Sequence, residues 1–251
     1  MSILSTAAIL LRTFPYGETS RILRFYTETH GVVGVMARGI RTTGGRRGGA
    51  LSTFSQGMLS FHHREGRDLQ TYRDFSSSNP RLGLARHPLR LAGASVLGEL
   101  VLRHSESEGS PSLFNALARG LSTMEEQPMD SFLAGLLMEL WPLVVELGYR
   151  PLLEHCVECR QAPGKQEMAR LDFGAGGLRC AACGGEGVGP RLGPRARFQL
   201  AALLTGRLRE DLLRPRAHLR LASDFITYHI SGGEPLRSMA VLYTLIPAHH
   251  A

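Results

Sequence analysis

The pattern of apolar and polar positions divides the chain into a β part and a helical part. Over the first 80 residues, short segments rich in β-branched, leucine or aromatic residues alternate with turn signals such as Pro15-Tyr16-Gly17. These segments predict five strands, at residues 6–14, 20–27, 32–38, 58–64 and 69–75. Five short strands with a longer excursion between the third and fourth match a small barrel such as the OB-fold. An SH3-like barrel gives nearly the same pattern.

From Pro88 onwards apolar residues recur at three- and four-residue spacing, which is typical of amphipathic helices. Helix punctuation agrees, with Pro111 at a start and Gly148 at an end. The pattern predicts helices at residues 88–105, 111–126, 130–148, 195–213, 219–231 and 236–246. We therefore expect an α+β multidomain protein, with an OB-fold β-barrel at residues 1–80 and an α-helical domain at residues 81–251.

The four cysteines of the chain form two C-x2-C pairs, Cys156/Cys159 and Cys180/Cys183, separated by twenty residues. Two such pairs supply the four thiolates that a tetrahedral Zn²⁺ prefers, so the spacing predicts a zinc ribbon. The alternatives are disulfides, which a reducing compartment disfavours, and unrelated free thiols.

The predicted ribbon occupies residues 154–186 and is inserted into the helical domain. Four protein ligands leave no open position for water or substrate, so we expect one structural Zn²⁺ per chain and no catalytic metal.

The charge distribution has two basic blocks on either side of an acidic middle. Residues 1–80 hold ten arginines against five acidic residues, a net charge of +5, and residues 187–220 hold eight arginines against two acidic residues, a net charge of +6. The whole chain carries +7. Two basic surfaces suit a polyanion such as nucleic acid.

A loop at residues 38–49 contains four arginines, five glycines and no acidic residue. Glycine lets the backbone approach a sugar-phosphate chain, and arginine neutralises phosphates; a solvated loop without a partner is the alternative. Aromatic residues lie between arginines on the predicted strands, as in barrels that stack bases on their rings. The candidate DNA-binding residues are Arg12, Arg24, Arg38, Arg41, Arg46, Arg47 and Tyr26.

Motifs of catalysis and of membrane insertion are absent from the sequence. It contains no P-loop, nucleophile elbow, HExxH or Rossmann glycine pattern, so no enzymatic activity is predicted. The most apolar run, residues 132–147, contains Glu139, Pro142 and Glu146 and therefore favours a buried helix over a membrane span. We expect a cytoplasmic protein.

The first 75 residues resemble the N-terminus of the RecO family of DNA repair proteins. The resemblance lies in residues 8–23, which include Tyr16-Gly17-Glu18-Thr19-Ser20, and continues in order through Tyr26-Thr27, residues 37–41, Leu51-Ser52-Thr53-Phe54 and Gly66-Arg67-Asp68-Leu69. The rest of the chain is similar in layout, as a helical domain interrupted by a four-cysteine module.

This resemblance implies an OB-fold that binds single- and double-stranded DNA, in a nucleoid-associated recombination mediator. It implies annealing of complementary strands coated with single-stranded-DNA-binding protein, and loading of RecA together with RecR. It also implies contact between the helical domain and the acidic, hydrophobic C-terminal tail of the coat protein. Composition suggests that the second basic block receives this tail, through Arg195, Arg197, Phe198 and Arg207. The alternative function is a zinc-ribbon nucleic-acid-binding factor of transcription or of the ribosome.

Overall fold

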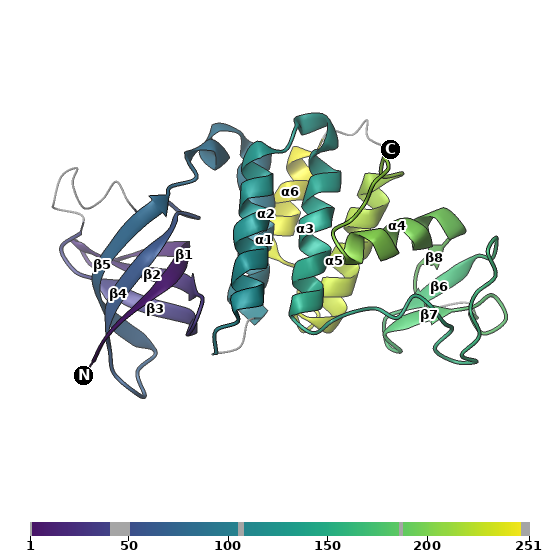
Figure 1. The fold of residues 1–251 in the computed structure, drawn as a ribbon, viewed down its shortest axis with the longest axis horizontal. Helices are drawn as coiled ribbons and strands as arrows, with labels where there is room; N and C mark the ends of the chain where they lie inside the picture. Colours follow the sequence, from purple (N-terminus) through teal and green to yellow (C-terminus); the bar gives the residue numbers. More distant parts are fainter. Residues whose placement is uncertain (1, 41–50, 105–107, 186–187, 247–251) are drawn as a thin grey trace. The chain divides into compact units, whose positions relative to one another are not determined.

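The chain divides into two compact units, Met1–Glu126 and Gln127–Ala251. The computed structural model describes residues 2–40, 51–104, 108–185 and 188–246. Unit 1 contains a β-barrel and two helices, and unit 2 contains the cysteines and the remaining helices (Figure 1). This arrangement confirms the predicted α+β fold class. The domain boundary predicted at residue 80 falls inside unit 1 and stays a prediction.

Five strands form the barrel of unit 1: β1 (Ser2–Tyr16), β2 (Ser20–Thr27), β3 (Gly31–Ala37), β4 (Gln56–His63) and β5 (Leu69–Asn79). They close in the order β1-β2-β3-β5-β4. Only the β3–β5 pair is parallel among these described strands. Strand β1 is long because it pairs with β4 through its first half and with β2 through its second half.

Alternation along the strands fills the barrel with apolar side chains. Leu23 and Phe25 on β2 point inward together with Val33 and Val35 on β3, while the residues between them point outward. Phe25 also packs on Phe75 of β5, with ring centroids 5.1 Å apart. This interior was accessible to sequence reasoning because a half-buried strand must repeat with a period of two residues.

Two helices pack on the barrel after a short 3-10 helix, η1 (Leu82–Arg86): α1 (Pro88–His104) and α2 (Pro111–Glu126). Gly98 of α1 lets the ring of Phe54 lie against the helix, because a Cβ at that position would come within 2.8 Å of the ring. Tyr26 of β2 stacks on Phe114 of α2, with centroids 6.4 Å apart. One aromatic contact thus anchors each helix to the barrel.

Arg81 joins the barrel to α2 through a buried guanidinium that is 3% exposed. Its Nη2 donates to Gln56 Oε1 of β4 and to the Ala118 carbonyl, both at 2.9 Å, and its Nη1 donates to Ser122 Oγ at 2.7 Å. Its backbone is left-handed, with φ of 47°, and its N–H is accepted by Asn79 Oδ1. The side chain thereby bonds two elements that are far apart in sequence.

Unit 2 contains η2 (Met129–Ser131), α3 (Phe132–Glu146), α4 (Pro194–Leu204), α5 (Pro215–His229) and α6 (Arg237–Leu245). Helix α3 packs against α4 and α5. Trp141, which is fully buried, contacts Phe225 of α5 at a centroid distance of 5.4 Å. None of the described helices is both long enough and apolar enough for a membrane crossing.

A small three-stranded sheet carries the cysteine segment of unit 2. Its strands β6 (Ala169–Asp172), β7 (Gly177–Arg179) and β8 (Arg191–Leu192) are arranged in the order β7-β6-β8. We call residues 152–192 the cysteine lobe. An isolated bridge between Leu152 and Gly177 connects the end of the α3 region to this sheet.

The helix predicted at residues 195–213 is wrong in its second half. Helix α4 ends at Leu204, and Gly206 follows in the left-handed conformation with φ of 63°. The segment beyond it is held by Gln199, whose buried amide bonds Glu210, the Asp211 carbonyl and the Leu213 N–H. The apolar periodicity predicted a longer helix because leucines continue at helical spacing into a segment that is not helical.

Candidate functional site

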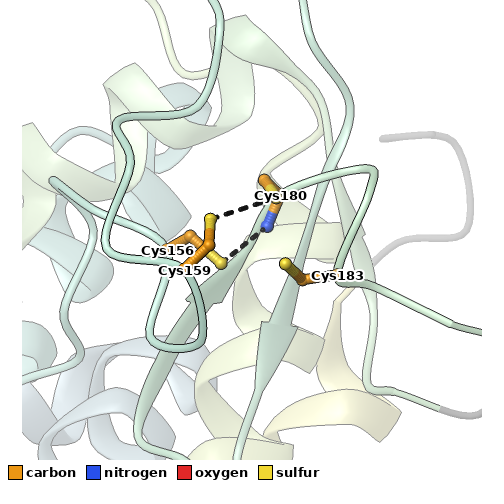
Figure 2. Close-up of side chains that lie close together, drawn as sticks. All are labelled: Cys156, Cys159, Cys180 and Cys183. Carbon is orange, nitrogen blue, oxygen red and sulfur yellow. Dashed lines mark hydrogen bonds between the residues drawn. The ribbon is translucent and has the colours of Figure 1, made fainter.

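The four cysteines meet at one point of the cysteine lobe (Figure 2). The Sγ atoms of Cys156, Cys159, Cys180 and Cys183 all lie within 4.8 Å of one another. Cys159 Sγ and Cys180 Sγ are 3.8 Å apart, and all four thiols are free. Four sulfurs placed about 2.3 Å from a central Zn²⁺ would be roughly 3.8 Å apart in a tetrahedron. The donor set and its spacing therefore fit a tetrahedral metal ion.

Backbone hydrogen bonds fold each C-x2-C pair into a tight turn. The Cys156 carbonyl accepts the Arg160 N–H at 2.9 Å, and the Cys180 carbonyl accepts the Gly184 N–H at 2.8 Å. A Cβ at Gly184 would come within 3.0 Å of that carbonyl, so glycine allows the second turn to close. The turns point both sulfurs of each pair toward the same centre.

The local environment separates the thiols by their pKa values. Burial raises the pKa of Cys156, but hydrogen bonds from backbone groups of Cys159, Cys180 and Glu158 outweigh it and lower that pKa to about 6. The hydrogen bond with the neighbouring Cys180 sulfur is the largest cause, and burial the second, of a rise in the pKa of Cys183 to about 12. One thiolate therefore forms readily, and its negative charge disfavours ionisation of the neighbouring thiols. A bound cation relieves this repulsion.

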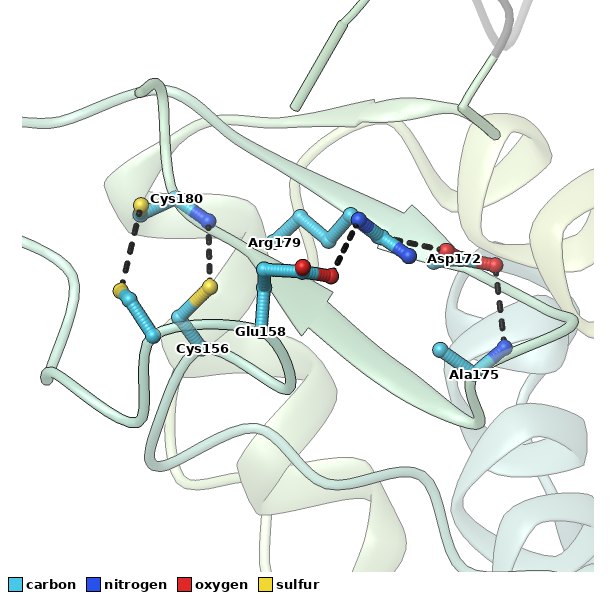
Figure 3. A network of polar contacts seen from close by, with 7 residues as sticks. Cys156, Glu158, Asp172, Ala175, Arg179 and Cys180 are labelled. Atoms are coloured by element: carbon cyan, nitrogen blue, oxygen red, sulfur yellow. Dashed lines mark hydrogen bonds and ion pairs between the residues drawn. The ribbon is translucent and has the colours of Figure 1, made fainter. Parts of the chain in front are cut away.

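Charged contacts stabilise the lobe around this centre (Figure 3). Arg179 of β7 donates from Nε to Asp172 at 2.6 Å and from Nη1 to Glu158 at 2.7 Å. Asp172 also accepts the Ala175 N–H at 3.0 Å. That backbone bond, together with Arg179, lowers the pKa of the Asp172 carboxyl. The network links the first cysteine turn to the β6–β7 hairpin.

Aromatic packing attaches the lobe to helix α5. Phe173, at the end of β6, contacts Phe225 edge-on at 5.9 Å and Tyr228 at 5.9 Å. His229 packs on Phe225 with centroids 4.3 Å apart, and burial lowers the pKa of this histidine. The cysteine centre is therefore connected through Phe173 to the core around Trp141.

A second candidate site lies on the outer face of the barrel in unit 1. Arg12 of β1 is the direct register partner of Arg24 of β2, and both side chains are exposed. The guanidinium of Arg12 lies 5.1 Å from the centroid of the Phe14 ring. Phe14 and Tyr16 are 38% and 56% exposed. We call Arg12, Phe14, Tyr16 and Arg24 the barrel face.

Gly34 of β3 continues the row of Arg12 and Arg24 across the sheet. A Cβ at Gly34 would lie 3.6 Å from Arg24 Nε, so the arginine side chain extends over the neighbouring strand. Arg38 directly follows β3 and is exposed. Arg41, Arg46 and Arg47 lie outside the described residues. Arg12 and Arg24 are thus the predicted DNA-binding residues that the structure brings together.

Tyr26 does not belong to an exposed nucleic-acid surface. It shares the outer side of β2 with Arg24, as alternation predicts, but α2 covers it through Phe114 and leaves it fully buried. The prediction failed because a strand's alternation does not reveal which outer positions a later helix covers. Conversely, Phe14 was missed, although its position two residues after Arg12 places both on the same face.

The predicted partner-binding residues occupy α4 and the segment after it. Arg195 pairs with Glu210 at 2.8 Å, and Arg197 donates to the carbonyls of Gly164 and Glu167. Phe198 is 62% exposed. Arg207 is also exposed. Arg197 therefore braces the cysteine lobe, and Phe198 and Arg207 are open to solvent.

The fold is of the α+β class, with a five-stranded barrel in unit 1 and a four-cysteine cluster in unit 2. The family model described as recombination protein O N terminal matches residues 1–81, and the one described as recombination protein O C terminal matches residues 86–239. The chain belongs to the recombination protein O, or RecO, family, whose members are DNA repair and recombination proteins.

Relatives from several bacteria match most of the chain. The DNA repair protein RecO of Rubrobacter xylanophilus is 34% identical over 236 residues, which cover 87% of this chain and 92% of that protein. The DNA repair protein RecO of Geobacter metallireducens is 30% identical over 96% of this chain and 98% of its own length. The DNA repair protein RecO of Anaeromyxobacter dehalogenans strain 2CP-C is 32% identical over 86% and 82%.

We predict that Asp172→Asn lowers the free energy of unfolding of unit 2 by about 1–3 kcal/mol at pH 7, because two donors lose a charged acceptor. The pKa of Asp172 is lowered in the folded state, so its contribution exists above the unfolded pKa of about 3.9 and is lost as pH falls below it. Urea unfolding followed by fluorescence of Trp141, the only tryptophan of the chain, measures the difference.

Asp224→Asn is the matched control, because Asp224 faces Arg220 at 3.9 Å and both are exposed. It should change stability by less than about 0.5 kcal/mol. Equal stability of the two variants at pH 7, or an Asp172→Asn deficit that does not shrink as pH falls below about 3.9, would contradict the assigned role of Asp172.

Proposed function

We propose that this protein is a recombination mediator without an enzymatic step of its own. It binds single- and double-stranded DNA and anneals complementary strands that carry single-stranded-DNA-binding protein. Together with RecR it helps to load RecA, and its place of action is the nucleoid in the cytoplasm. Membership of the RecO family over both units supports this proposal.

The like-charged pair of the barrel face is the observation that carries the DNA-binding part. Arg12 and Arg24 face each other directly across β1 and β2. Like charges in such positions destabilise a sheet by roughly 0.2–1 kcal/mol, so the pair has a cost in the free protein. A phosphate between the two guanidinium groups turns this repulsion into two attractions.

Exposed aromatic rings beside the pair suit single-stranded DNA. Phe14 supports Arg12 through a cation–π contact, and Tyr16 extends the same strand end. Bases stack on such rings for about 1–3 kcal/mol each, irrespective of sequence. Backbone neutralisation and stacking contain no base code, which suits a protein that must act at any damaged sequence.

Annealing follows from neutralisation in this proposal. Two complementary strands repel one another through their phosphates, and arginines that replace counterions lower that repulsion. The sequence adds further positive charge directly after β3, in the exposed Arg38 and in Arg41, Arg46 and Arg47. The protein then serves as a scaffold on which base pairing itself supplies the driving force.

The contact with the coat protein is proposed for the α4 region. An acidic and hydrophobic tail needs an exposed apolar side chain and a nearby positive charge, and Phe198 and Arg207 offer these. Arg195 and Arg197 contribute less directly, because Glu210 and the carbonyls of the cysteine lobe already engage them.

The cysteine centre is proposed to hold one structural Zn²⁺ through Cys156, Cys159, Cys180 and Cys183. A bound Zn²⁺ would balance the thiolate charges and add to the small apolar core that Leu171, Leu178 and Leu192 form in the lobe. The closed set of four ligands suits a structural role. The family match favours the recombination mediator over the alternative of a transcription- or ribosome-associated zinc-ribbon factor.

We predict that Arg12→Gln/Arg24→Gln slows annealing of two complementary oligonucleotides, each coated with single-stranded-DNA-binding protein. Two lost phosphate contacts weaken binding on the order of tenfold at moderate salt. Fluorescence transfer between labelled strands measures the rate. Arg150→Gln/Arg220→Gln, which removes the same charge from exposed positions of unit 2, should anneal like the wild type. Failure of the wild-type protein to accelerate annealing would reject the proposal.

We predict that the purified chain contains one Zn²⁺ and that Cys156→Ser loses it, with cooperative unfolding of the cysteine lobe while the barrel persists. Ala182→Ser, an exposed change in the second turn, should retain the metal. Protons compete with the metal for thiolates, so retention should fall as the pH is lowered. Metal analysis and circular dichroism test this; full metal content in Cys156→Ser would contradict it.

A further inference from the structure

Unit 1 has a second basic feature where β5 leads into η1. A pocket of about 510 Å³ lies there, and its lining includes Asn79, Arg81, Gly83, Arg86, Arg90 and Glu125. Three arginines against one glutamate give this lining an excess of two positive charges. We call it the η1 pocket.

Arg81 forms the buried wall of the η1 pocket. Its hydrogen-bond partners Gln56, Ala118 and Ser122 are all neutral acceptors, and its Nε has no hydrogen-bond partner among the described residues. A buried guanidinium is costly unless negative charge is close. Glu125 and Glu126 supply part of that charge through space, but burial is the larger effect and lowers the pKa of Arg81. An anion in the pocket would add to the negative charge.

Arg86 and Arg90 bring two further guanidinium groups to the open side. Arg86 is exposed, and no hydrogen bond or ion pair holds it within the described part of the chain. Arg90 lies in the first turn of α1, which contains no acidic residue. The N-terminus of a helix is the positive end of its dipole, which repels the Arg90 guanidinium and attracts an anion. Arg90 is therefore favourable at this position when an anion binds between its guanidinium and the helix N-terminus.

The one acidic residue of the lining is already engaged. Glu125 Oε1 accepts the Gly83 N–H at 2.7 Å, and a Cβ at Gly83 would come within 2.6 Å of the same oxygen. Glycine at this position therefore lets the carboxylate close against the backbone of η1. This hydrogen bond ties the glutamate to the wall and leaves the excess positive charge with the arginines.

The pocket and the barrel face are joined by a single strand. Leu69 at the start of β5 is the register partner of Gly34, which lies next to Arg24, and Asn79 at the end of β5 lines the pocket. Around the other side of the barrel the route is shorter, because Ile9, three residues before Arg12, pairs with Gln56, and Gln56 pairs with Asn79. Three residues of β1 and two strand spacings span about 20 Å. A DNA strand covers that distance with about six nucleotides at 3.4 Å each.

From these observations we infer that the η1 pocket binds a backbone phosphate of DNA that also contacts the barrel face. Arg86 and Arg90 contact the phosphate, and Arg81 is a positioning residue that holds the wall. This inference rests on the proposed DNA-binding function and adds a second contact point to it. The guanidinium forks match the phosphate oxygens in pairs.

The test compares Arg86→Gln/Arg90→Gln with Arg12→Gln/Arg24→Gln and with the control Arg150→Gln/Arg220→Gln. Fluorescence anisotropy measures the affinity of each protein for a 25-base-pair duplex. For this duplex, the pocket variant should bind on the order of tenfold more weakly. The slope of log affinity against log salt should decrease by about 0.9, the value for one lost phosphate contact.

The single variant Arg86→Gln, at an exposed position, should show a smaller decrease in slope than the double variant, and it guards against misfolding of the double variant. If the pocket variant binds DNA with the affinity and salt slope of the wild type while the barrel-face variant binds more weakly, the inference is overturned and the proposed function stands. Absence of binding by the wild-type chain would reject both proposals. If the pocket variant loses binding to a polyglutamate peptide while its DNA binding is unchanged, the pocket belongs to an acidic peptide, and the inference is also overturned.

Discussion

Unit 1 depends on one buried guanidinium. Arg81 follows the last strand of the barrel, turns through a left-handed backbone, and bonds β4 at Gln56 and α2 at Ala118 and Ser122. Hydrophobic contacts such as Tyr26 on Phe114 bring the helices to the barrel, but they are non-directional. The three directed hydrogen bonds fix where α2 lies, and with it which outer positions of β2 are covered. The exposure of Arg24 and the burial of Tyr26 follow from that placement.

The sequence predicted the barrel and the cysteine cluster well, because both depend on local rules. Strand alternation places Leu23 and Phe25 correctly, and two C-x2-C pairs bring four sulfurs together irrespective of the rest of the fold. Positions that depend on tertiary contacts were less accessible. The burial of Tyr26 needs α2, the end of α4 needs the Gln199 side chain, and Arg81 shows no pattern that separates it from surface arginines. In each case a long-range partner outweighs a local preference.

The two units use charge in different ways. In unit 2, Arg179 and Arg197 are consumed by structure, since they hold Asp172, Glu158 and the carbonyls of the cysteine lobe. In unit 1, Arg12 and Arg24 face each other across the sheet. Net charge alone does not distinguish these roles. The contacts in the structure assign a bracing role to Arg179 and Arg197, whereas the like-charged pair of Arg12 and Arg24 suits a polyanion partner.

Hydrogen exchange of the full chain, with and without single-stranded DNA, tests the barrel face most directly. The account predicts slower exchange in Ser20–Thr27 and Gly31–Ala37 and in the second half of β1 when DNA is bound. Exchange in the cysteine lobe should stay unchanged. Protection confined to unit 2, with β1 to β3 unaffected under conditions where DNA binds, would contradict the central claim that the barrel holds the strand.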